Sequence, residues 1–328
     1  MEKNLLVGNG INIQFGGIEN YSNSAIMRRV IKNINSGKYN ALTDNYLSPN
    51  DQLAILDKMV NIVDKIKAGY YTECADGLFM LMELDRIRRT YPTKSTIESV
   101  FLEDYFLAFE IFNNKFREED GDIQSELYRK VMFTFLQQII VDSIFYNGEI
   151  NKAYINAPSG TKKFFEKFNN IFTTNYDYNI ENILGRKDSV CHLHGEFNQL
   201  SSKYDTNSLY YKSHKKECDD LIVKKIHGMD HIYSNAVMSW SWLDKYGDLI
   251  EPDARKKEEL FMSISGQVEI LGLSPNNDEH LFLLLSQNTK VKSIVYYYVN
   301  DADSKEILHH INKPIICKKT TELWKSLE

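Results

Sequence analysis

Short apolar runs that end abruptly in polar residues or glycine recur along the chain. They occupy residues 4–7, 171–174, 190–193, 268–274, 293–299 and 314–317. A short apolar run bounded by turn residues is typical of a strand that is buried on both faces. Helical patterns lie between several of these runs. Together the patterns predict a set of about five strands alternating with helices, which is an α/β fold with a Rossmann-like, mainly parallel sheet and helices on both faces.

The block between the first two strands has a different pattern. Ser48 and Pro49 are typical of a helix start, and apolar residues then recur at helical spacing until Gly69. A helix over residues 22–36, stopped by Gly37, precedes this block. Similar patterns follow at residues 77–89, 95–116 and 123–146. We therefore expect about four consecutive helices and no strand in this part of the chain.

This helical block divides the chain into two predicted parts. Residues 1–44 and 155–328 are expected to form a Rossmann-like domain, and residues 45–154 a helical insertion or lid subdomain. Such a block either acts as a lid or partner-docking surface, or is simply a helical subdomain that packs on itself. The pattern alone leaves both interpretations open.

Composition narrows the class of protein. The chain has 328 residues, of which 43% are hydrophobic, and this is ample for a packed core. The formal net charge is -6, so no basic excess favours nucleic-acid binding. No apolar run reaches the ~18 residues of a membrane span, and the N-terminus shows no signal-peptide pattern. We expect a globular, cytoplasmic protein that binds neither membrane nor nucleic acid.

Cysteine and histidine spacing gives little support for a metal site. The cysteines are Cys74, Cys191, Cys218 and Cys317. They never occur as a CxxC pair, so a zinc site built from two such pairs is excluded, and we expect buried thiols. His227 and His231 are four apart and would share one face of a helix, but no third ligand is evident. We expect no metal.

Polar residues follow three of the predicted strands. The first strand breaks into Gly8-Asn9-Gly10, the second into Thr174-Asn175-Tyr176-Asp177, and the third into His194-Gly195-Glu196. Because parallel strands end at the same edge of a sheet, these residues are expected to converge on one crevice, as in a nucleotide site. Glycine in the first turn permits close approach of a phosphate.

The residue types suit cleavage of the N-glycosidic bond of a nicotinamide nucleotide. Asn175 can hold a water molecule or a ribose hydroxyl, and His194 can accept a proton near neutral pH. Asp177 can stabilise developing positive charge or orient the nicotinamide amide. Each residue also has a simpler interpretation. His194 would then be a turn histidine, and Asn175 and Asp177 would cap the helix over residues 178–184.

Four motifs resemble those of the sirtuin family. Gly8-Asn9-Gly10-Ile11-Asn12, with Gly16-Gly17-Ile18 behind it, resembles G-A-G-x-S followed by G-I-P-D-F-R. Thr174-Asn175-Tyr176-Asp177 resembles T-Q-N-x-D, Leu193-His194-Gly195 resembles L-H-G, and Gly272-Leu273-Ser274 resembles a later G-x-S. The motifs come in the family's order and span most of the chain except the helical block.

The departures from the family pattern point to one branch of it. Glu19-Asn20-Tyr21-Ser22 replaces P-D-F-R, Asn9 and Asn12 replace alanine and serine, and the four-cysteine zinc module is missing. The chain instead resembles the sirtuin-like domains of bacterial anti-phage effectors, which hydrolyse NAD in abortive infection. This resemblance implies an NAD+ hydrolase that releases nicotinamide and ADP-ribose, with NAD as substrate and no metal.

The resemblance also implies the site residues. Asn175 and His194 correspond to the family's catalytic pair, and we add Asp177 on the chemistry given above. Residues expected to contact the cofactor are Gly8, Asn9, Gly10, Asn12, Thr174, Gly272, Ser274 and Asn300.

A free NAD hydrolase would kill its host, so we expect control by homo-oligomer formation, by an activating partner subunit or by a phage component. Three alternatives remain open. They are an NAD-dependent protein deacylase, a non-catalytic module that senses NAD or ADP-ribose, and a related abortive-infection family that also begins with a Gly-Asn-Gly strand end.

Overall fold

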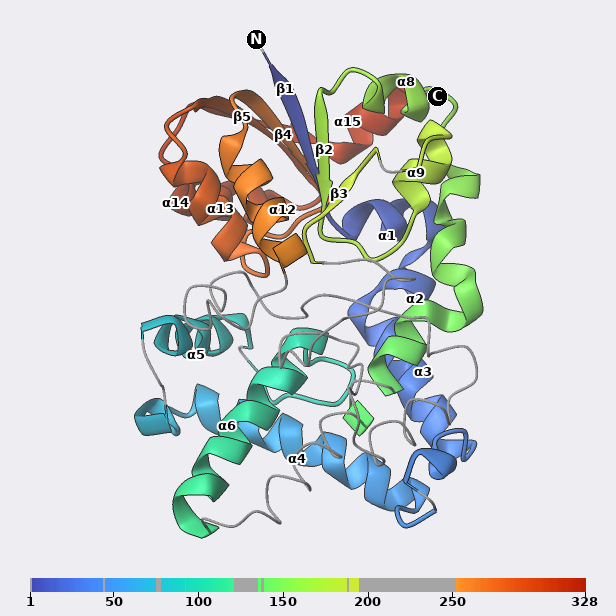
Figure 1. The fold of residues 1–328 in the computed structure, drawn as a ribbon, viewed down its shortest axis with the longest axis vertical. Coiled ribbons are helices and arrows are strands. Elements are labelled where there is room, and N and C mark those ends of the chain that lie inside the picture. The colour runs from blue at the N-terminus through green and yellow to red at the C-terminus, as the bar shows by residue number, and fades with distance from the viewer. Residues whose placement is uncertain are drawn as a thin grey trace. The chain divides into compact units, whose positions relative to one another are not determined.

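The computed structural model describes residues 2–43, 45–74, 78–91, 93–120, 135–136, 139–187, 189–194 and 252–328 (Figure 1). The chain forms two compact units. The first consists of Met1–Tyr21, Gly148–Phe197 and Ser239–Glu328, and the second of Ser22–Asn147 and Asn198–Met238. The first unit therefore breaks off after Tyr21 and resumes at Gly148. The sequence pattern instead predicted these boundaries near residues 44 and 154.

The first unit is built on a six-stranded sheet. Its strands are β1 (Lys3–Val7), β2 (Asn170–Thr173), β3 (Cys191–His192), β4 (Gly266–Leu271), β5 (Val291–Tyr298) and β6 (Ile315–Lys319). They lie in the order β3-β2-β1-β4-β5-β6, and every pairing is parallel. The predicted Rossmann-like parallel α/β fold is confirmed, and each of the six apolar runs of the sequence overlaps one of its strands. The strand order reverses between β1 and β4, where ligands of open α/β sheets characteristically bind.

Alternate residues of each strand face opposite sides of the sheet, and both sides are covered by helices. On one side, Leu6 and Ile270 pack in a core that includes residues of α12 (Pro252–Ser263), α13 (Glu279–Gln287) and α14 (Asp301–His310). On the other side, Leu5 and Val7 pack with residues of α1 (Gly10–Gly16), α8 (Thr161–Phe165), α9 (Asn179–Leu184) and α15 (Thr320–Lys325). This two-sided burial explains why β1, β2, β4 and β5 are apolar runs with little polar alternation.

Two short segments complete the described part of the first unit. Helix α2 (Ile18–Tyr21) follows α1, and the 3-10 segment η3 (Tyr146–Asn156) leads from the second unit back toward β2. The main chain and side chains of η3 contact the start of α9: the Asn151 Oδ1 atom accepts a hydrogen bond from the Tyr178 amide at 2.8 Å. These contacts place the loop after β2 against η3.

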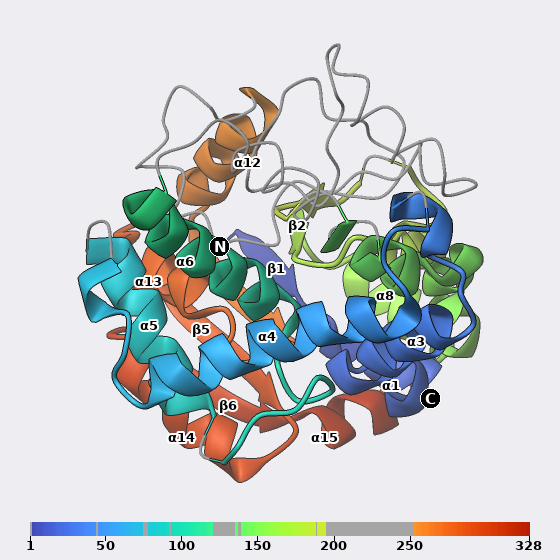
Figure 2. The same ribbon diagram turned by 90° about the horizontal axis from the view of Figure 1, so that it is seen from below.

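The described residues of the second unit contain helices and no strand. They form α3 (Asn23–Asn35), η1 (Asn40–Thr43), α4 (Pro49–Lys67), η2 (Thr72–Cys74), α5 (Leu78–Thr90) and α6 (Leu102–Asp120). Helix α4 packs against α3, α5 and α6 (Figure 2). The first three helices expected after residue 45 are confirmed. The fourth lies largely outside the described residues, and its end, residues 139–145, is helical.

Local signals set the helix ends in this unit. The Ser48 side chain accepts a hydrogen bond from the Asp51 amide, and the Asp51 carboxylate accepts one from the Ser48 amide at 2.9 Å. Pro49 occupies the first helical position, where its missing N–H is not needed. At the end of α3, Gly37 has a φ of 74° and its amide donates to the Ile34 carbonyl.

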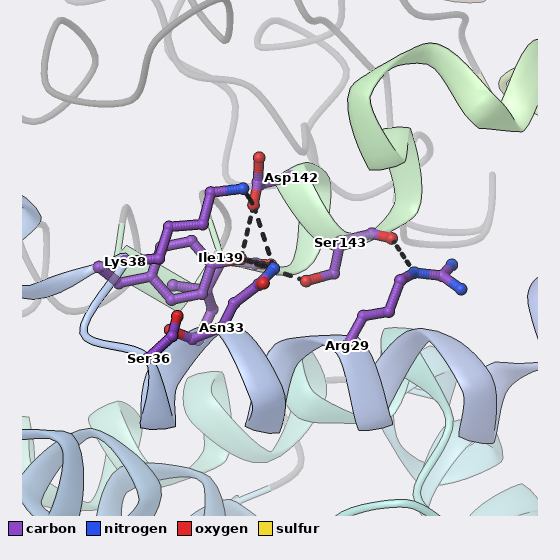
Figure 3. A network of polar contacts seen from close by, with 8 residues as sticks. Arg29, Asn33, Ser36, Lys38, Ile139, Asp142 and Ser143 are labelled. Atoms are coloured by element: carbon purple, nitrogen blue, oxygen red, sulfur yellow. Dashed lines mark hydrogen bonds and ion pairs between the residues drawn. The ribbon is translucent and has the colours of Figure 1, made fainter.

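A buried polar cluster joins α3 and the residues after it to the helical segment 139–145 (Figure 3). The Asp142 carboxylate accepts hydrogen bonds from the Lys38 ammonium group and from the Tyr39 hydroxyl, the latter at 2.7 Å. Arg29 donates from Nε to the Ser143 carbonyl at 2.8 Å. Burial, and next the Asp142 charge, raise the pKa of Tyr39, so its hydroxyl stays protonated and donates.

None of the helices in the described ranges combines the length and apolar character needed to cross a membrane.

Candidate functional site

The loops that follow β1, β2, β3 and β4 are joined at the edge of the sheet where these strands end. The Thr174 amide donates to the Val7 carbonyl at 3.0 Å, and the Gly8 amide to the Leu271 carbonyl at 2.9 Å. Between β2 and β3, Thr173 pairs with His192, and the Leu193 amide donates to the Thr173 carbonyl. The predicted motifs therefore start from neighbouring strands.

The glycine turn after β1 packs directly on the turn after β4. The Gly10 amide donates to the Gly272 carbonyl at 2.9 Å. A Cβ atom on Gly8 would lie 2.6 Å from the Gly272 oxygen, and one on Gly10 would lie 2.6 Å from the Gly272 Cα. Gly272 itself has a φ of 75°. The packing of the two turns thus accounts for these glycines without a phosphate.

Asp177 is held inside the protein by the residues around it. Its Oδ2 atom accepts a hydrogen bond from the Asn12 side chain at 2.6 Å, and its Oδ1 atom accepts one from the Asn179 amide at 2.9 Å. The Asn179 side chain in turn donates to Asn12 Oδ1 at 2.9 Å. Burial raises the pKa of Asp177 above its ordinary value, although both hydrogen bonds oppose the shift. Asp177 therefore precedes the N-cap residue Tyr178, binds the first amide of α9 and ties this helix to α1.

Asn175 is almost fully buried, with 5% of its surface exposed. Its main-chain amide donates to Thr173 Oγ1 at 3.0 Å, and its side-chain Nδ2 atom donates to the Gly8 carbonyl at 3.3 Å. The Asn175 carbonyl oxygen lies 2.7 Å from Nδ1 of His192. The backbone and the amide group of this residue are therefore fixed by β1, β2 and β3 together.

His192 is a site residue that the sequence motifs did not single out. It is 2% exposed and contacts Asn175 through one ring nitrogen and Glu181 Oε1, at 2.8 Å, through the other. The Tyr178 ring packs edge-on against it, with centroids 5.6 Å apart. A histidine inside a buried strand needs hydrogen-bond partners for both ring nitrogens. The position of His192 within a predicted buried strand was therefore the signal in the sequence that it makes specific polar contacts.

His194 lies two residues beyond the end of β3 and is half-buried. Burial lowers the pKa of His194 from 6.5 to about 4. The imidazole is therefore neutral at neutral pH, and a neutral imidazole has one nitrogen that can accept a proton. Gly195 and Glu196, which follow it in the motif, lie outside the described residues.

The remaining predicted site residues differ in their exposure. Thr174 and Ser274 are half-buried and follow β2 and β4, and the Ser274 carbonyl accepts a hydrogen bond from the Asp278 amide. Asn9 is exposed on the glycine turn and donates to the Tyr21 carbonyl at 2.8 Å. Asn300 is exposed beyond β5 and caps α14 by accepting a hydrogen bond from the Asp303 amide at 2.8 Å.

Metal-binding side chains do not cluster in the described ranges: no group of three His, Cys, Asp or Glu residues there is placed to hold an ion. Cys191 and Cys317 are both half-buried. The pair His227 and His231, and Cys218, lie outside the described residues.

Comparisons with known proteins identify no relative. No family model, no curated protein and no solved structure matches this chain. The strand order and the parallel pairing define its class, a Rossmann-like α/β protein with polar residues gathered after β1, β2 and β3.

Proposed function

We propose that this protein is an NAD+ hydrolase that cleaves the bond between nicotinamide and ribose. The observation that carries the proposal is the pairing of Thr173 with His192 across β2 and β3. Asn175 and His194 each lie two residues beyond this pair, so a carboxamide and a neutral imidazole follow neighbouring strand ends. The sirtuin-like motifs described above support NAD as the substrate.

In the proposed reaction, water attacks C1′ of the nicotinamide ribose. The N-glycosidic bond breaks, and its electron pair leaves with nicotinamide, which becomes neutral. Asn175 orients the ribose or the water, and His194 accepts the proton that water loses. A transition state of this kind carries positive charge on the ribose, so groups that position the nucleophile lower the barrier directly.

The electrostatics of His194 fit this role. With a pKa of about 4, the ring is neutral across the neutral pH range, so one of its nitrogens carries a hydrogen and the other can accept a proton. Its basicity is lower than that of a histidine that titrates near neutral pH, and the electron-deficient ribose carbon compensates by needing less activation of the attacking water. The resemblance to anti-phage effectors further supports a role in antiviral defence by abortive infection, with NAD depletion as the outcome.

The test is chromatography of NAD incubated with purified protein in the absence of any peptide. We expect nicotinamide and ADP-ribose from the wild type, and loss of turnover by about 100-fold or more in His194→Ala and Asn175→Ala. His309→Ala, which removes an exposed histidine of α14, is the matched control and should keep full activity. A fully active His194→Ala protein contradicts the mechanism.

Two other results would identify the alternatives. Cleavage that requires an acyl-lysine peptide would indicate a deacylase. Binding of NAD without turnover at any protein concentration, and with any candidate activator, would indicate a sensing module.

A further inference from the structure

The proposed reaction makes no use of the buried pair His192 and Glu181. Both side chains are almost fully enclosed, with 2% and 5% of the residue exposed. His192 belongs to β3, and Glu181 belongs to α9, the helix that follows the Asn175 loop. Burying a carboxylate and an imidazole is costly unless the two are hydrogen-bonded, so their arrangement calls for an explanation.

Hydrogen-bond accounting fixes the protonation of the His192 ring. Its Nδ1 atom lies 2.7 Å from the main-chain oxygen of Asn175. A carbonyl oxygen can only accept, so Nδ1 must carry a hydrogen and donate it. The Nε2 atom lies 2.8 Å from Glu181 Oε1, a distance that also requires a hydrogen between them.

The pair therefore holds one shared proton between Nε2 and Oε1. It is either an imidazolium with a carboxylate or a neutral ring with a carboxylic acid. In both forms Nδ1 keeps its hydrogen and points it at Asn175. The hydrogen bond between Nε2 and Glu181 thus fixes which hydrogens the ring carries and keeps Nδ1 protonated. The outer hydrogen-bond partner of a catalytic or metal-bound histidine acts in the same way.

Among the described residues, three contacts anchor Asn175, and the one with His192 comes from β3. The other two anchors are the Thr173 hydroxyl of β2 and the Gly8 carbonyl beyond β1. Since His194 follows β3, the bond from His192 ties the loop that carries Asn175 to the strand that presents His194. Loss of this bond would let the two groups move apart while leaving the sheet intact.

We propose that His192, with its Nδ1–H held in place by Glu181, is the positioning residue that sets Asn175 relative to His194. The effect on turnover rests on the proposed function, whereas the hydrogen bond to Asn175 does not. His192 touches no reacting atom in this scheme and acts through the Asn175 carbonyl.

The experiment compares four variants by NAD turnover and thermal unfolding. His192→Phe keeps a ring but removes both nitrogens, and His192→Asn keeps an N–H donor at the place of Nδ1. Glu181→Gln keeps a partner for Nε2, because its amide can donate to a neutral ring. His310→Phe is the matched control, since His310 is also largely enclosed and faces two carboxylates, Glu279 and Glu306, each at 3.5 Å.

We expect kcat to fall about tenfold or more in His192→Phe, while KM for NAD changes less than about threefold. His192→Asn should regain most of the lost kcat, and Glu181→Gln should stay within about threefold of the wild type. His310→Phe should leave kcat unchanged even if it unfolds at a lower temperature. Equal kcat values for His192→Phe and His310→Phe would overturn the inference.

A second measurement needs neither a variant nor turnover. Protein labelled with ¹⁵N in its eight histidines allows the ring nitrogens to be assigned by long-range ¹H–¹⁵N correlation. We expect a protonated Nδ1 on His192 at neutral pH, and an unprotonated Nδ1 would overturn the inference. If the wild-type protein never cleaves NAD, the proposed function fails, and the spectrum still decides whether the His192 anchor exists.

Discussion

The lowered pKa of His194 links its burial to the pH dependence of stability. Between about pH 6.5 and 4, an unfolded histidine binds a proton that the native ring does not bind. Stability must therefore fall as the pH drops through this window. We expect the free energy of unfolding of the wild type to lose about 1–3 kcal/mol more than that of His194→Ala between pH 7 and pH 4.5.

Urea unfolding of both proteins at the two pH values checks this prediction. The other titrating groups are the same in the two proteins, so their contributions cancel in the comparison. An identical loss of stability in wild type and variant would mean that the imidazole is accessible to solvent protons at its ordinary pKa.

Gly10 lies where the backbones of two turns meet, and its replacement has a predictable cost. The added Cβ of Gly10→Ala would lie 2.6 Å from the Gly272 Cα, which is main chain and cannot rotate away. We expect a loss of about 2 kcal/mol or more in unfolding free energy, as for other overpacked sites. Asn9→Ala, on the exposed side of the same turn, should cost about 1 kcal/mol or less. Equal losses would refute the close packing.

At the scale of elements, helix α3 and the helical segment 139–145 are joined by the buried Asp142 carboxylate (Figure 3). Its removal leaves the Tyr39 hydroxyl and the Lys38 ammonium group without their acceptor. We expect Asp142→Ala to cost about 2–4 kcal/mol. Lys38 is 38% exposed and can turn to water, so Lys38→Ala should cost less than about 1 kcal/mol.

Thermal unfolding monitored by circular dichroism measures both variants. NAD turnover at low temperature serves as a control, because the cluster contains none of the proposed site residues. Similar losses for the two variants would contradict this prediction, because the ion pair with Lys38 would then account for the whole contribution of Asp142.

At the scale of the whole molecule, the proposed activity requires control. We expect specific activity on NAD to rise with protein concentration, because assembly follows mass action. Light scattering at the same concentrations should show the matching rise in mass. His194→Ala is the control, since it should assemble without cleaving NAD. A monomer with constant specific activity across the series would contradict control by assembly and leave an activating partner as the proposal.

Much of the fold could be predicted because its signals are local. Gly37 ends α3 through its own backbone conformation, and Ser48 with Asp51 begins α4 through bonds made within one turn. Strands β1, β2, β4 and β5 were recognisable because burial on both faces leaves little polar alternation. Strand β3 was less recognisable, and only Cys191–His192 form it within the predicted run of 190–193.

The candidate site was predictable only in part. The motifs identified Asn175, Asp177 and His194 as candidate site residues. They did not predict the hydrogen bond between Asp177 and Asn12, which are 165 positions apart in the sequence. They also passed over His192 and Glu181, because a histidine in a strand and a glutamate in a helix are unremarkable until they meet. Their meeting depends on how β3 and α9 pack, which no local pattern encodes.

By itself, the sequence determined which segments are helices, which are buried strands, and which strand ends carry polar groups. These properties depend on backbone sterics and on hydrophobic spacing within a few residues. Only the tertiary structure decided the strand order, the contact of Gly8 and Gly10 with Gly272, and the three anchors of Asn175. Such contacts join segments that are far apart in the sequence. They form only when the whole core packs against both faces of the sheet, so no local pattern specifies them.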